Sequence, residues 1–183
     1  SELERVEEEI KKLIRTSREI NKEVAKRIEE TIKESRDINK EVVDRIRELI
    51  ERLREVVKRD GGETRRVVEI ADEVLKTIRD LLRRVKEITD KLHEDNERLL
   101  RRVEEVSKKV LDDIKRLIED LRRRGVDEKE LKRVEDEVRK VVEESKDHLR
   151  KVYEKSKKVV EESKEHLDRV LREVEKEIEE IRR

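Results

Sequence analysis

Aliphatic side chains recur along this chain in steps of three and four residues that average 3.6, the period of an α-helix. In the first part of the chain they form a stripe about 140° wide on a helical wheel. The pattern is interrupted twice, at Asp60-Gly61-Gly62-Glu63 and at Gly125-Val126-Asp127. It therefore predicts three amphipathic helices, over residues 2–59, 64–123 and 128–181.

The residues at the interruptions are typical of helix ends. Gly61-Gly62 and Gly125 can adopt the positive φ that ends a helix, and Asp127 with Glu130 matches a capping box. Ser1-Glu2-Leu3-Glu4 matches a capping box at the start of the first helix. Because both connections are short, neighbouring helices must run antiparallel. We expect an all-α fold, an elongated up-down-up three-helix bundle in which residues 1–183 form a single domain.

A repeat of 18 residues runs through the pattern. Residues 17–24 recur almost unchanged as residues 35–42, and residues 141–149 recur as residues 159–167. At 3.6 residues per turn, 18 residues make five whole turns, so both copies of each repeat face the same way. A period of 3.6 also requires no supercoil, so nearly straight helices are expected.

Polar residues interrupt the apolar stripes at matching heights. For antiparallel helices joined by these turns, level residues have numbers that sum to about 123 between the first and second helices and about 251 between the second and third. Three sets of polar residues then share a level: Ser17, Asn21, Ser107, Ser145 and His148; Ser35, Asn39, Thr89, Ser163 and His166; and Thr31, His93, Asn96, Tyr153 and Ser156.

These sets predict buried hydrogen-bond networks. Serine, asparagine and histidine together supply donors and acceptors, and a buried polar group without a partner costs roughly 1–3 kcal/mol. A slip of one helical turn would place every such group against leucine or valine. The expected role of the polar layers is therefore to specify helix register and pairing.

Composition supports long helices and excludes several classes of function. Charged residues make up 57% of the chain and apolar residues 32%, with 52 basic and 52 acidic residues and no proline. The balanced, periodic charge argues against disorder and against attraction to nucleic acid or membrane surfaces. Apolar runs never exceed two residues, so no transmembrane helix is expected, and there is no cysteine for disulfide chemistry.

The histidines were the only candidates for catalysis or metal binding. His148 and His166 lie about 27 Å apart along a helix, and no carboxylate accompanies them on the stripe. Serine–histidine catalysis also needs an oxyanion hole, for which an unbroken helix has no free N–H groups. We therefore expect no enzyme, no metal, no cofactor and no small-molecule substrate.

Ideal helix caps, a Gly-Val-Asp turn, duplicated polar layers and the near absence of Phe, Met, Trp, Pro and Cys together resemble computationally designed helical bundles with buried hydrogen-bond networks. Natural spectrin-like modules usually contain tryptophan and irregular heptads, which are missing here. The resemblance implies a stable, soluble synthetic scaffold without natural activity, expected in the cytoplasm on recombinant expression. A monomer is favoured. The alternative is an interaction component of a designed oligomer, either awaiting a partner helix or self-associating.

Overall fold

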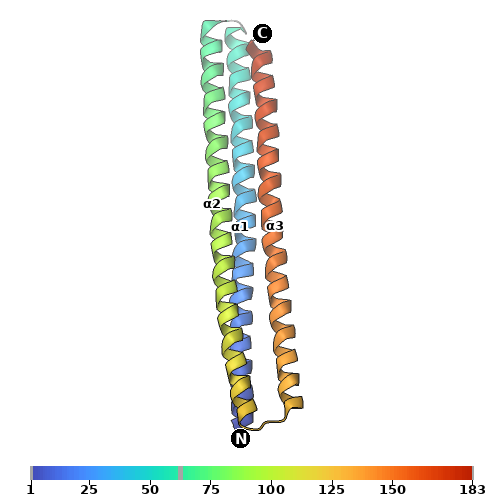
Figure 1. The fold of residues 1–183 in the computed structure, drawn as a ribbon. Helices are drawn as coiled ribbons and strands as arrows, with labels where there is room; N and C mark the ends of the chain where they lie inside the picture. The colour runs from blue at the N-terminus through green and yellow to red at the C-terminus, as the bar shows by residue number, and fades with distance from the viewer. Residues whose placement is uncertain (1, 62–63, 183) are drawn as a thin grey trace. The chain divides into compact units, whose positions relative to one another are not determined.

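The chain forms three α-helices that pack as a three-helix bundle, as the sequence predicted. The computed structural model describes residues 2–61 and 64–182, and its helices are α1 (Glu2–Asp60), α2 (Arg65–Arg123) and α3 (Glu128–Arg182) (Figure 1). Each predicted boundary lies within one residue of the observed one. No strand occurs in the described ranges.

The connection between α2 and α3 has the backbone geometry that its glycine predicted. Gly125 has a φ of 85°, its N–H donates to the carbonyl of Arg122 at 3.1 Å, and the Val126 N–H donates to Leu121 at 3.2 Å. This pair of bonds is a Schellman motif, which only a residue in the left-handed region can complete. Asp127 then caps α3, because its Oδ1 accepts the N–H of Lys129 at 3.4 Å.

The connection between α1 and α2 is described on both sides of residues 62–63. Gly61 has a φ of 84°, and its N–H donates to the carbonyl of Val57 at 2.8 Å. Thr64 caps α2, since its Oγ1 accepts the N–H of Val67 at 3.3 Å. The expected capping role of Ser1 and the second glycine of the turn, Gly62, lie outside the described residues.

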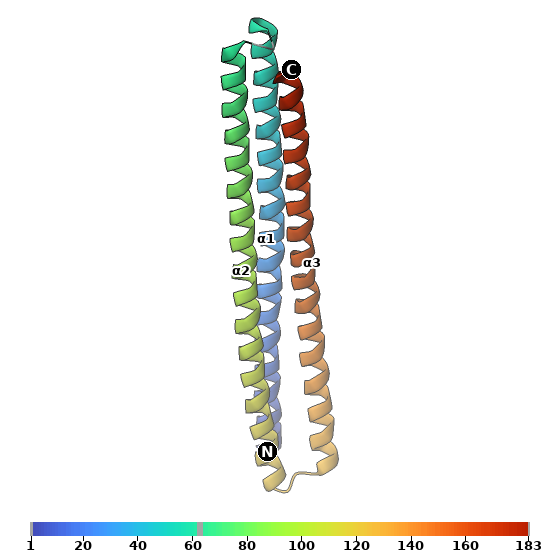
Figure 2. The same ribbon diagram turned by 45° about the horizontal axis from the view of Figure 1, so that its top comes forward.

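The helices divide into two compact units, which we describe separately. Unit 1 comprises Ser1–Glu30 and Glu94–Ser156, and unit 2 comprises Thr31–His93 and Lys157–Arg183. In each unit a segment of α2 runs antiparallel to segments of α1 and α3 (Figures 1 and 2). Every helix continues unbroken from one unit into the other.

Each unit has its own apolar core, built from the stripes of all three helices. In unit 1 the buried core residues are Ile10, Ile114, Ile118, Leu121, Leu131, Val138 and Val142. In unit 2 they are Val43, Ile46, Ile50, Leu53, Ala71, Ile78, Leu82, Val85, Leu167, Val174 and Ile178. Burying a side chain of this size removes it from water at a gain of about 1.5–3 kcal/mol. The cores are almost entirely Ile, Leu and Val, so the polar residues among them need a separate explanation.

Candidate functional site: buried polar side chains

Unit 1 buries an asparagine from each of α1 and α2. Asn96 and Ser156 are each 2% exposed, and the Asn96 amide nitrogen donates to the Ser156 hydroxyl at 3.2 Å. Their residue numbers sum to 252, close to the value of 251 expected for level positions on α2 and α3. Because both groups are removed from water, neither has solvent as an alternative partner, and the bond links the two helices at one height.

A second polar contact in unit 1 joins α1 to α3. Asn21 is buried, and its amide nitrogen donates to the hydroxyl of half-buried Ser145. Ser17 and Ser107 are also buried in this unit. The carbonyl oxygen of Asn21 is buried and accepts no hydrogen bond from the residues that the structure describes. The amide of Asn21 is therefore satisfied on its donor side and not on its acceptor side.

Unit 2 buries the corresponding residues with fewer contacts between helices. Ser35, Asn39 and Thr89 are buried, and Ser163 is half-buried. Thr89 donates to the carbonyl of Val85 on its own helix at 2.8 Å, so its hydroxyl contributes no link between helices. Within the described ranges, the hydroxyl of Ser35 and the carbonyl oxygen of Asn39 have no hydrogen-bond partner. Although the repeat places the same residue types in both units, their hydrogen bonds differ.

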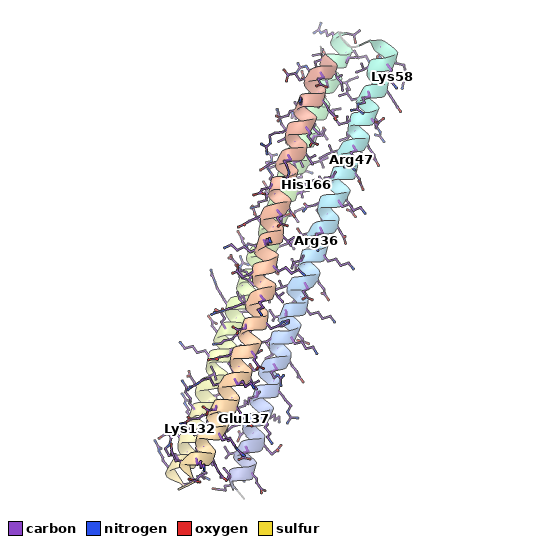
Figure 3. The ribbon with its side chains drawn as sticks, turned by 90° about the vertical axis from the view of Figure 1, so that its right-hand side faces the viewer. Arg36, Arg47, Lys58, Lys132, Glu137 and His166 are labelled. Carbon is purple, nitrogen blue, oxygen red and sulfur yellow. The ribbon has the colours of Figure 1, made fainter. Side chains whose placement is uncertain are left out.

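Two histidines lie outside the positions expected for them. His148 and His166 are exposed, so the prediction that they belong to buried layers is corrected. Each follows a half-buried serine by three residues, and that step turns the side chain about 60° toward the edge of the stripe. His166 borders a groove between α3 and α1 that also contains Asn39 and has Arg36 and Arg47 along it (Figure 3).

The remaining predicted residues are half-buried: Thr31 and His93 in unit 2, and Tyr153 in unit 1. The Tyr153 hydroxyl donates to the Glu97 carboxylate at 2.8 Å. Burial, followed by this hydrogen bond, raises the pKa of Tyr153 from 10.0 to about 12. Glu97 was not among the predicted polar residues, because its place at the stripe edge looks like solvent. The height arithmetic would have found it, since its number and that of Tyr153 sum to 250.

Charged side chains connect α2 and α3 along the rim of unit 2. Arg79 pairs with Glu175 at 3.2 Å, and Lys86 pairs with Asp168. Asp90 pairs with Lys164. The paired side chains are between 33% and 55% exposed, so each contributes about 0–1 kcal/mol. The sequence had indicated only pairs within a helix at these positions.

At the start of α3, Arg122 holds two carboxylates. It donates to Glu128 at 3.0 and 2.9 Å and to Glu119 at 2.7 Å. The hydrogen bond from Arg122 lowers the pKa of the Glu128 carboxyl, and the same bond raises the pKa of Arg122. These fully exposed contacts fix the turn between α2 and α3 at the surface of unit 1.

The described residues contain no group of three or more His, Asp or Glu side chains placed to hold a metal ion. None of the helices in the described ranges has a segment long and apolar enough to cross a membrane. The polar residues gathered in the two units are thus hydroxyls and amides that bond to one another or to backbone.

Three amphipathic helices around apolar cores define the class of the protein as a three-helix bundle. No protein-family model and no curated protein matches the sequence. A solved structure described as "Computationally designed three helix bundle" is similar over 98% of this chain and 88% of its own length, with a TM-score of 0.59 and 17% sequence identity. The likeness shows the fold, and the expected resemblance to designed bundles is confirmed at that level.

Proposed function

We propose that the protein is a designed structural scaffold, without catalytic activity, whose buried polar side chains specify helix register. The Asn96–Ser156 hydrogen bond carries the proposal, because both residues are 2% exposed and lie on different helices. One turn away from Ser156, α3 presents Val152 and Val160. A slip by one turn would therefore leave the Asn96 amide against valine, at a cost of roughly 1–3 kcal/mol.

A layer of this kind lowers stability less than it narrows the choice of structures. An apolar pair of similar volume would pack about as well, but it would pack equally well one turn higher or lower. The polar pair has a partner at one height alone. The repeated apolar positions make such a device useful, because an 18-residue repeat offers similar packing in slipped registers.

The test compares register in the parent chain and in a variant with an apolar layer. The chain has no cysteine, so spin labels can be attached at Glu105→Cys and Asp147→Cys, two exposed positions at one level in unit 1. We expect one narrow distance distribution by electron paramagnetic resonance. Replacing Asn96→Leu and Ser156→Ala in the labelled chain should broaden the distribution or add a second distance. A distribution as narrow as that of the parent would contradict the proposal.

A second candidate function is that of an interaction component which receives a further helix. The supporting observation is the exposure of two large aliphatic side chains on α2, Ile88 at 45% and Val106 at 40%. They are 18 residues apart, so they occupy the same position in the repeat and the same side of α2. A monomeric scaffold gains nothing from exposed aliphatic side chains placed so regularly.

A further inference from the structure

Unit 1 carries a band of partly exposed aliphatic side chains where α1 meets α2. Leu13 of α1 and Leu117 of α2 line a groove of about 580 Å³ between these helices. Steps of three, four, seven and eleven residues from these two positions continue the band on the same helix sides. Its other half-buried or exposed members are Val6, Ile20, Leu99, Val106 and Val110.

The band is bounded by charged residues on both sides. One row further out, α1 presents exposed Arg5 and Glu23, and α2 presents exposed Arg102 and Asp120. The outer surface of the two helices is therefore charged, and the apolar surface is confined to the groove between them. A second copy docking face to face would bury these charges. One helix lying in the groove would cover the apolar band and leave the charges at its rim, which is the usual geometry of helix-in-groove binding.

The charge of the groove selects the flanks of such a helix. Its lining includes four carboxylates, those of Glu9, Asp113, Glu119 and Asp120, against two guanidinium groups, those of Arg116 and Arg123.

Two of these carboxylates already have partners, Arg122 for Glu119 and Arg124 for Asp120. Glu9 and Asp113 make no ion pair or hydrogen bond with any residue in the described part of the chain, and Asp113 is half-buried. They approach the groove from opposite walls, so a cation between them would relieve their repulsion.

We propose that the α1–α2 groove of unit 1 binds a single amphipathic α-helix whose aliphatic stripe is flanked by lysine or arginine. The aliphatic stripe packs on Leu13, Val106 and Leu117, and the basic flank lies against Glu9 and Asp113. This inference rests on the second candidate function and specifies its partner by chemistry.

The test uses two synthetic peptides of about 18 residues, the length of five helical turns. Both have leucine at helical spacing, and their flanks are lysine in one and glutamate in the other. Fluorescence anisotropy with the full chain at low salt should give a dissociation constant on the order of 10 µM for the lysine peptide. The glutamate peptide should bind roughly tenfold more weakly, and added salt should reduce the difference.

Protein variants locate the binding. Val106→Asn should weaken binding of the lysine peptide about fivefold or more by removing aliphatic contact. Ile88→Asn is the matched control, since it changes the same repeat position in unit 2 and should leave binding unchanged. Asp113→Asn should weaken the lysine peptide about threefold and leave the glutamate peptide no weaker than before.

The outcomes separate the chemistry from the docking function. If both peptides bind equally and Val106→Asn weakens both, a helix docks but the basic partner is wrong. If neither peptide binds, both the inference and the second candidate function fail. If sedimentation shows a dimer that Val106→Asn abolishes and neither peptide disturbs, the groove belongs to a second copy, and the inference is overturned.

Discussion

Three residues separate Ser145 from His148, and Ser163 from His166, and in each pair the serine is half-buried while the histidine is exposed. The step advances each side chain by about one turn, so the height is nearly right. It also rotates the side chain by about 60° away from the stripe, toward the neighbour that α1 provides. Polar residues at equal height therefore meet only when their rotation about the helix axis also agrees.

Tyr153 offers a residue-scale prediction because it is the only aromatic side chain. With its pKa raised to about 12, the phenolate absorbance should appear well above the ordinary value of 10.0. Glu97→Gln removes a negative charge and a strong acceptor, so the midpoint should fall while staying above 10, since burial remains. A midpoint near 10 in the parent chain would show that Tyr153 is solvated.

The same shift makes stability depend on pH in alkali. Between pH 10 and about 12 the unfolded chain has lost the tyrosine proton and the folded chain has kept it. The folded state then binds more protons, so its stability falls as pH rises through this range. Tyr153→Phe should lack this part of the loss when the two chains are compared by chemical denaturation at pH 9 and pH 12.

At the scale of elements, the helix ends follow from local chemistry. The Schellman motif at Gly125 and the cap at Asp127 involve residues within six positions of one another, so the pattern of Gly-Val-Asp suffices to predict them. The start of α2 was placed one residue early, because Thr64 serves as the cap rather than as the first helical residue.

Gly125→Ala tests the conformational requirement of this turn. An added Cβ would meet no atom within 4 Å, so any loss comes from the φ of +85° alone. We expect a loss of about 1–2 kcal/mol in the free energy of unfolding, the cost of the left-handed region for a residue with a Cβ. Gly125→Asn should lose less, because asparagine tolerates this region. Equal stability of the glycine and alanine chains would contradict the expected strain.

At the scale of the whole molecule, we predict that residues 1–183 unfold as one domain. All three helices pass from unit 1 to unit 2 without a break, at residues 30–31, 93–94 and 156–157. Helix formation is cooperative along a chain, so loss of one unit should destabilise the helical segments of the other.

Matched core variants measure this coupling. Leu131→Ala in unit 1 and Leu53→Ala in unit 2 each remove a buried side chain, at a cost of about 2–5 kcal/mol. Amide hydrogen exchange followed by mass spectrometry should show faster exchange in both units for either variant. Faster exchange confined to the altered unit would mean that the chain has two independently unfolding domains.

The sequence by itself determined the three helices, their ends and the heights at which residues such as Asn96 and Ser156 face each other. Those properties depend on the rise per residue and on turn chemistry, which are set by neighbours along the chain. Only the tertiary structure decided which polar residues are buried, that Tyr153 bonds to Glu97, and that the band of Val106 and Leu117 stays partly exposed. These depend on where the other two helices lie around each axis, and packing of the whole bundle sets that angle.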